Sequence, residues 1–268
     1  MSAREDDRAL LVAAVRAAGP VAMGFFRGVV KSWEKNPDDP VSEADHAVND
    51  CLKARLHDVR PDYGWLSEET PDDSDRLKRE RVWVVDPIDG TKAFLRGEPE
   101  FTICAALLEA GRPTLAAVYN PASDEFFEAA AGGGARLNGA PIRASAADAL
   151  DHARLLAGRR MFERAGYDGP PAGCSFRFVN SIGYRLALVA AGRFDSCVSL
   201  NGKSDWDIAA ADLIVQEAGG KVTTARGLPF AYNGRSTRHG SVVASAPALH
   251  DKVLGMLGRI QPPHGASW

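Results

Sequence analysis

The sequence contains little cysteine: four residues in 268, widely spaced and without a C-x-x-C pair. This spacing gives no reason to expect a disulfide and is typical of reduced thiols in a cytoplasmic protein. No basic run or basic-aromatic stripe occurs, and the net charge is −3, which argues against a nucleic-acid polymer as partner. The acidic N-terminus lacks the apolar core of a signal peptide, and we expect no apolar stretch long enough to span a bilayer.

The remaining pattern is that of an ordinary globular chain with mixed secondary structure. Ser42 is an expected N-cap, and the segments 31–40 and 71–81 are polar and are expected to be a loop and an exposed stretch. Apolar periodicity predicts helices over 6–27, 43–59, 184–191, 206–218 and 247–257, and strands over 63–66, 101–108, 114–119, 154–157, 194–199 and 242–244. The mixture predicts a layered α/β (α+β) fold, with one domain in two lobes, roughly 1–150 and 151–268.

The most informative segment is Trp83–Thr91, in which an apolar run ends in two acids and a Gly-Thr turn. A proline follows Asp86 and holds that residue extended, so its carboxylate is expected at the end of a buried strand. Gly90 permits a tight turn, and Thr91 can open a short helix over 91–95 whose free N–H groups favour an anion. Ordinary turn chemistry can produce the same residues.

Four acids lie in apolar or structured contexts: Glu68, Asp86, Asp89 and Asp207. Asp207 lies in the first turn of a predicted helix that is apolar nearly all round, although an acid at Asp205 or Asp207 can also be only an N-cap. If the four carboxylates converge, they cannot all ionise unless cations compensate them. Oxygen ligands select Mg²⁺, Mn²⁺ or Ca²⁺, and two such ions can activate water and shield a phosphate without a covalent nucleophile.

At these motifs the chain resembles the inositol monophosphatase superfamily of Mg²⁺-dependent, lithium-sensitive phosphatases. The resemblance covers nearly the whole chain and is carried by three segments in order: Ser67-Glu68-Glu69, Trp83–Thr91, and Trp206–Ala210 with Glu217–Gly220. It implies an αβαβα layered sandwich of the inositol monophosphatase and fructose-1,6-bisphosphatase type, usually a homodimer. It also implies two or three Mg²⁺ ions, with Mn²⁺ as a substitute and Li⁺ as an inhibitor.

The resemblance also assigns roles to individual residues. Glu68 and Thr91 would orient the attacking water, with Asp45 paired to Thr91, and the backbone N–H groups of Gly90 and Thr91 would hold the phosphate. The implied metal ligands are Glu68, Asp86, the Ile88 carbonyl, Asp89 and Asp207.

Within the superfamily the motifs look most like the bacterial 3′(2′),5′-bisphosphate nucleotidases. Inositol monophosphatases carry a Glu about seven residues before the last metal-binding Asp, and here that place is Leu200, flanked by Ser199 and Asn201. The segment Ser181–Arg185 matches the nucleotidases' Gly-Ser-Ser-x-Lys, with Arg for Lys and Ser for Gly. The expected substrate-binding residues are therefore Gly90, Thr91, Ser181, Gly183, Arg185 and Asp207, although Arg185 can also be a solvated helix residue.

Several alternatives stay open at this point. The substrate of such a phosphatase can be inositol 1-phosphate or another small phosphate ester such as histidinol phosphate. A non-catalytic metal-binding regulatory protein is the alternative from a different class, and would be favoured if Glu68 or Thr91 were replaced. In haloacid-dehalogenase-type phosphatases the two acids are two residues apart, whereas Asp86 and Asp89 are three apart. The histidines show no ligand spacing.

Overall fold

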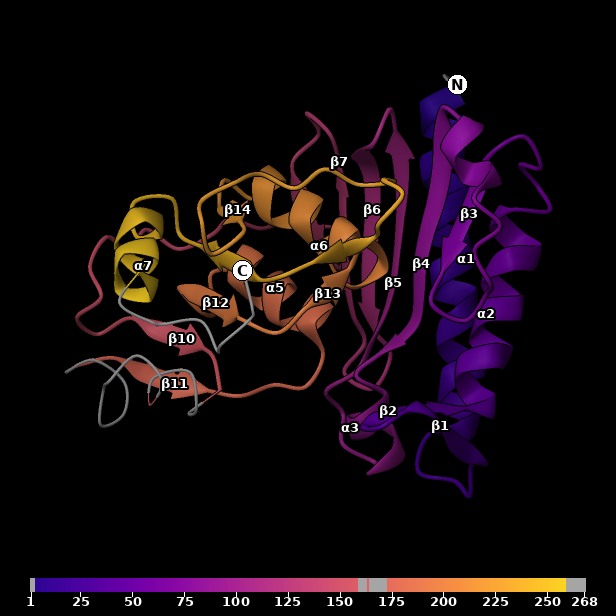
Figure 1. The fold of residues 1–268 in the computed structure, drawn as a ribbon, viewed down its shortest axis with the longest axis horizontal. Helices are drawn as coiled ribbons and strands as arrows, with labels where there is room; N and C mark the ends of the chain where they lie inside the picture. Colours follow the sequence, from indigo (N-terminus) through magenta and orange to yellow (C-terminus); the bar gives the residue numbers. More distant parts are fainter. Residues whose placement is uncertain (1–2, 159–162, 164–172, 259–268) are drawn as a thin grey trace.

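Two antiparallel-packed helices form the outer layer on one side of the molecule, in a computed structural model that describes residues 3–158, 163 and 173–258 (Figure 1). They are α1 (Ala3–Phe25) and α2 (Glu43–Leu56). Ser42 caps α2 as expected: its hydroxyl accepts from the Ala44 N–H, while the Asp45 carboxylate accepts from the Ser42 N–H. Both predicted helices are confirmed, each ending two or three residues early.

The large sheet lies beneath these helices and has seven strands in sequence order. Its first pair is parallel and every later pair is antiparallel. The strands are β3 (Gly64–Ser67), β4 (Arg81–Asp89), β5 (Thr102–Glu109), β6 (Arg112–Asn120), β7 (Glu125–Ala130), β8 (Ala135–Leu137) and β9 (Ala140–Pro141).

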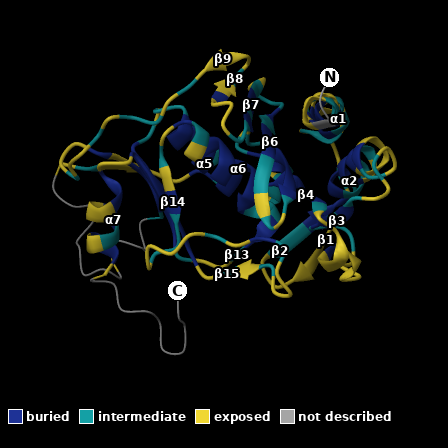
Figure 2. Ribbon diagram, turned by 90° about the horizontal axis from the view of Figure 1, so that it is seen from above, coloured by how far each residue is buried: buried dark blue, intermediate teal, exposed yellow. Residues whose placement is uncertain are grey.

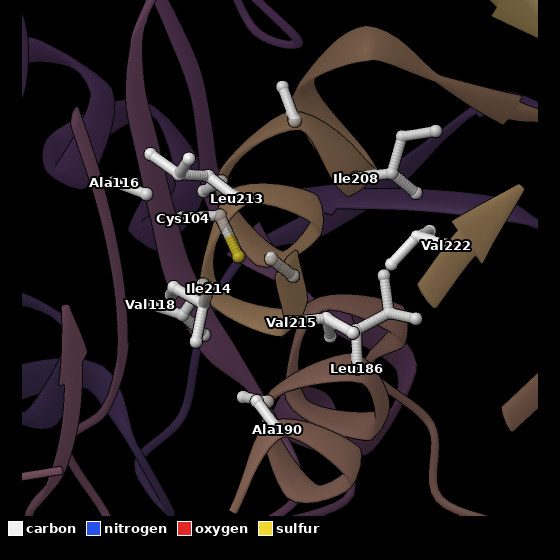
Figure 3. Packing of buried hydrophobic residues seen from close by; sticks show 14 of the residues in the cluster. Cys104, Ala116, Val118, Leu186, Ala190, Ile208, Leu213, Ile214, Val215 and Val222 are labelled. Atoms are coloured by element: carbon white, nitrogen blue, oxygen red, sulfur yellow. The ribbon is translucent and has the colours of Figure 1, made fainter. Parts of the chain in front are cut away.

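This sheet is buried on both faces, which explains the unbroken apolar runs of its central strands. Trp83 and Val85 pack with α1 and α2, whereas Val82 and Val84 pack on the opposite side with α5 (Ile182–Ala190) and α6 (Asp205–Glu217). Figure 3 shows that second cluster, where side chains of the sheet meet those of both helices and of β14.

A second sheet and a last helix complete the layers. Its order is β11 (Ser175–Arg177), β10 (Arg154–Leu156), β12 (Ser196–Ser199), β16 (Val242–Ser245) and β14 (Lys221–Thr223). One face packs on α5 and α6, and the other face is covered by α7 (His250–Leu257). The succession helices, sheet, helices, sheet, helix is the expected αβαβα sandwich (Figure 1). The two sheets support a lobe boundary near residue 150, which we retain as a proposal.

Two expectations from the sequence were wrong. The first concerns the segment 31–40, which is not a plain loop but mostly a hairpin of β1 (Ser32–Asn36) and β2 (Asp39–Ser42). The charged segment 71–81 is largely exposed as expected, but it contains a 3-10 helix (Asp75–Lys78) in which Arg76 is buried, because Asp72 and Asn233 pair with its guanidinium. A further small ladder joins β13 (Lys203–Ser204) to β15 (Arg238–His239).

The second concerns α1, where the stretch Arg4–Phe25 is long and apolar enough, by length and composition alone, to cross a membrane. We had expected no such stretch. Leu11, Val15, Ala18 and Ala22 bury one face of α1 against α2 and the large sheet, while the other face is open in Figure 2. A one-sided apolar stripe is how a core helix of a globular fold packs.

Candidate active site

A one-residue irregularity in β4 turns both of its acids to the same side. Asp86 pairs with Cys104 and Asp89 with Thr102, so three steps on β4 match two on β5. In a regular strand, residues three apart point to opposite faces, and an extra residue reverses that relation. Ile88 accordingly packs with the α1 and α2 side of the sheet, and both carboxylates face α6. Pro87 fits here because it has no N–H to pair.

Asp207 completes a group of three carboxylates. It lies in the first turn of α6, and one carboxylate oxygen from each of Asp86, Asp89 and Asp207 lies within 4.8 Å of the others. Asp207 also accepts a hydrogen bond of 2.5 Å from the Ser204 N–H, so it serves as a helix cap while it contributes to this acidic group. Asp205 instead accepts from the Asn233 N–H and pairs with His239, away from the group.

Burial and mutual repulsion act strongly on these acids. Desolvation, and then the charge of Glu68, raises the pKa of Asp86 well above its ordinary value. Desolvation and the neighbouring Asp207 raise the pKa of Asp89 to about 6, although the hydrogen bonds from Ser181 and Gly183 act to lower it. Desolvation also raises the pKa of Glu68 to about 7. The fold therefore holds charges that protein groups alone do not balance.

The donor set fits a hard divalent cation. Asp86 Oδ1 is buried and has no hydrogen-bond partner among the described residues, which is costly unless something else supplies positive charge. Three carboxylates at this spacing, with no sulfur or imidazole among them, are ligands that Mg²⁺ or Mn²⁺ prefers. Asp86, Asp89 and Asp207 could hold such an ion together, and Glu68 lines the same cavity.

Lys35 is a residue that sequence reasoning missed. It lies on β1, and its Nζ donates to Glu68 at 2.7 Å and to Glu69 at 2.8 Å. Burial alone would lower the pKa of Lys35, but the Glu68 and Glu69 carboxylates raise it. Since the segment was expected to be a loop, nothing in the sequence placed this lysine opposite an acid, although Asn36-Pro37-Asp38 is a turn signal within a hairpin.

The Gly-Thr turn after β4 has the predicted form. Gly90 has φ +98°, and a Cβ there would lie 2.9 Å from the Glu100 carbonyl oxygen, so only glycine fits. Helix α3 (Thr91–Leu95) begins directly afterwards. Thr91 Oγ1 lies 3.0 Å from the Ile88 carbonyl and 3.2 Å from Asp45 Oδ1, which places the expected Asp45 and Thr91 pair within hydrogen-bond distance.

Ser181 and Gly183 both contact Asp89. The Ser181 hydroxyl donates to Asp89 Oδ2 at 2.6 Å and the Gly183 N–H donates to the same oxygen at 2.5 Å. Neither belongs to the described residues that line the cavity. They hold the Asp89 carboxylate in place, and their direct binding of substrate stays a prediction.

The acids open into a cavity of about 610 Å³ with three cationic residues on its wall, Lys92, Arg185 and Lys203. Lys92 pairs with Asp38. Arg185 is only 5% exposed, and neither it nor Lys203 has a carboxylate oxygen within 4.0 Å among the described residues. Arg185 donates from Nε to the Ser181 carbonyl at 3.4 Å but has no carboxylate partner among the described residues. It is thus buried, not the solvated helix residue that was the alternative. Ser199, Leu200 and Asn201 also line the cavity, so this part of the wall carries no acid.

Comparisons with known proteins agree with this geometry. The chain matches the model of the "Inositol monophosphatase family" over residues 4–261. It is 38% identical to the "Inositol-1-monophosphatase" of Rhizobium meliloti, covering 91% of this chain and 94% of that protein. It is 33% identical to the "Nus factor SuhB" of Pasteurella multocida, covering 93% of each. Among solved structures, the IMPase of Thermotoga maritima superposes with a TM-score of 0.82 at 29% identity, over 93% of this chain and 95% of that one.

Proposed function

Because this chain belongs to the inositol monophosphatase family, it is a Mg²⁺-dependent phosphomonoesterase, and we propose that its preferred substrate is a nucleoside 3′(2′),5′-bisphosphate. One observation carries the substrate proposal. Arg185 is a buried cation on the cavity wall with no carboxylate partner among the described residues, and burying a charge in that way is costly. A second phosphate group on the substrate would complete the pair through charge-assisted hydrogen bonds.

The rest of the wall supports the same substrate. Inositol monophosphatases are expected to hold inositol hydroxyls with a carboxylate, and the positions where we expected it carry Ser199, Leu200 and Asn201, none of which is acidic. A site without that carboxylate loses the charge-assisted hydrogen bonds that it would form with a polyol. Lys203 adds a second positive charge to this side of the cavity, so the wall opposite the acids favours an anion.

We propose that the scissile phosphate lies between the acidic group and the turn after β4. The N–H groups of Gly90 and Thr91 would bind its oxygens, while Glu68, Asp86, the Ile88 carbonyl, Asp89 and Asp207 would hold the cations. When bound, Mg²⁺ supplies the positive charge that shields the phosphate oxygens, lowers the pKa of water and neutralises the leaving alkoxide.

The protein's own groups position the attacking water. Thr91 Oγ1 has one proton and two acceptor oxygens around it, Ile88 O and Asp45 Oδ1, so its lone pairs remain available to accept from a water. Glu68 would take up the proton of that water. A bond forms from the water oxygen to phosphorus, the ester P–O bond breaks, and the leaving oxygen takes a proton, which yields inorganic phosphate and a nucleoside 5′-phosphate without a covalent phosphoenzyme.

The test compares 3′-phosphoadenosine 5′-phosphate with inositol 1-phosphate on the wild-type protein and on Arg185→Met, which keeps the apolar stem. We expect higher kcat/KM for the bisphosphate, and a loss of about tenfold to a hundredfold in Arg185→Met for that substrate only. Arg177→Met is the control, because Arg177 is exposed and pairs with Glu100 outside the cavity. Equal losses on both substrates, or a wild-type preference for inositol 1-phosphate, would refute the bisphosphate assignment.

Inositol 1-phosphate is the second candidate, because the similar protein from Rhizobium meliloti is named an inositol-1-monophosphatase. The same assay decides between the two. A homodimer and a cytoplasmic location stay predictions from the resemblance and from the four free cysteines. Light scattering checks the first and cell fractionation the second.

A further inference from the structure

Phe178 is an exposed aromatic side chain on the wall of the active-site cavity. It follows β11 directly and is 55% exposed, whereas its neighbour Val179 is buried. The acids and cations described above make most of this wall polar. A large apolar ring left in water at such a wall costs free energy that a bound apolar group would recover.

One face of this ring is already covered. The Cζ of Arg185 lies 5.4 Å from the centroid of the Phe178 ring, which is cation–π distance. Because Arg185 is itself almost completely buried, the exposed part of Phe178 is the opposite face together with the ring edge.

Arg185 and Phe178 therefore form two adjacent binding surfaces that favour different chemical groups. Arg185 binds an anion, and the open face of Phe178 binds a flat apolar surface. A nucleotide joins these two features across a single ribose. A polyol phosphate offers the anion but no planar aromatic face.

We propose that Phe178 stacks on the nucleobase of the substrate and so makes this phosphatase specific for leaving groups that carry a planar heteroaromatic ring. The inference rests on the proposed function, since the base and the second phosphate belong to the same leaving group. Stacking holds the leaving group and not the reacting phosphorus, so Phe178 acts on KM far more than on kcat.

The experiment measures KM and kcat for adenosine 3′,5′-bisphosphate and for its base-free analogue, 1-deoxyribose 3,5-bisphosphate. Three variants are used: Phe178→Leu, which removes the aromatic face but stays apolar; Phe178→Trp, which keeps it; and Phe176→Leu. Phe176 lies two residues earlier on β11 and does not belong to the described residues lining the cavity. Calorimetric binding of adenosine 5′-phosphate, the product, gives a readout independent of turnover.

For Phe178→Leu we expect a KM at least about fivefold higher for the base-bearing substrate, little change in kcat, and weaker binding of the product. Phe178→Trp and Phe176→Leu should resemble the wild type, and the base-free analogue should be indifferent to all three changes. An equal effect of Phe178→Leu on both bisphosphates assigns the ring to the sugar or to its contact with Arg185 and overturns the inference, as does no effect at all, while the bisphosphate preference itself stands. Wild-type preference for inositol 1-phosphate over both bisphosphates overturns the proposed function and this inference together.

Discussion

Replacing Asp86 by Asn is expected to stabilise the metal-free protein while abolishing its activity. Asp86 lies within 4.8 Å of the Asp89 and Asp207 carboxylates, where two unit charges repel by about 3.5 kcal/mol at an effective dielectric constant of about 20. Keeping Asp86 protonated instead costs about 1.4 kcal/mol for each pH unit above its ordinary pKa of 3.8. Either route costs about 3 kcal/mol or more at pH 7.

The substitution removes this cost without breaking a hydrogen bond of Asp86 Oδ1, which has none to the described residues. The buried amide of Asn imposes about 1 kcal/mol of its own, which leaves a net gain of about 2 kcal/mol. For a chain of this size that corresponds to a rise in Tm of roughly 4–8 °C. With Mg²⁺ present the wild type should have the higher Tm of the two proteins, because only the wild type is stabilised by binding the cation.

Differential scanning calorimetry in chelator and in Mg²⁺ measures both effects, with Asp62→Asn, an exposed acid, as the control.

Protonation of the acids should reduce the same repulsion between carboxylates in the metal-free protein. The folded-state pKa values of Glu68 (about 7) and Asp89 (about 6) lie above the ordinary values, so the folded state binds more protons than the unfolded state. Metal-free protein should therefore gain stability as the pH falls from about 8 to about 5. An Asp86→Asn variant less stable than wild type in chelator, or a wild type that loses stability over this pH range, would refute the reasoning.

Three further predictions concern the same centre. Gly183→Ala should lower kcat and Tm, because its Cβ would lie 2.6 Å from Cys104 Sγ and 3.1 Å from Asp89 Oδ2; unaltered turnover would contradict the packing. The control Gly255→Ala in α7, whose Cβ would meet no atom within 4 Å, should leave kcat unchanged and raise Tm slightly, because alanine is the better helix former. Thr91→Ala should lower kcat more than it raises KM in steady-state assays if Thr91 orients the water, and a change confined to KM would assign it to substrate binding. Lithium at roughly tens of millimolar should inhibit Mg²⁺-supported turnover, since a monovalent ion at a carboxylate site supplies too little charge for the leaving group, and undiminished activity would count against that site.

The sequence was sufficient for the layered architecture because its main signals are local. Three of these signals depend only on a few neighbouring residues: the apolar run that ends at Asp86, the N-cap at Ser42 and the turn at Gly90. The fold then confirmed helix α3 at the predicted residues and all three layers of helices. The family resemblance supplied the order of these elements.

The sequence was not sufficient where a partner comes from far along the chain. Strand β1 is exposed throughout and has no apolar alternation, although β2 buries Val41 and Ser42, so the pairing of Lys35 with Glu68 has no local signal. Arg76 looks like any surface arginine until Asn233 is placed beside it. Ser181 and Gly183 were recognised as part of a motif, but only the packing of α5 against β4 and β5 reveals that they donate to Asp89.

The position of β4 between β3 and β5 has a consequence for amide hydrogen exchange. Strand β4 is paired with β3 on one side and with β5 on the other, and its residues are buried, so exchange at Val84 and Val85 requires a strand of the large sheet to separate from β4. The hairpin of β1 and β2 is joined to the sheet by few contacts and should exchange through small local openings. The part of the centre that β4 carries should therefore open rarely. The hairpin that carries Lys35 should detach from the acids and return many times before the protein unfolds once.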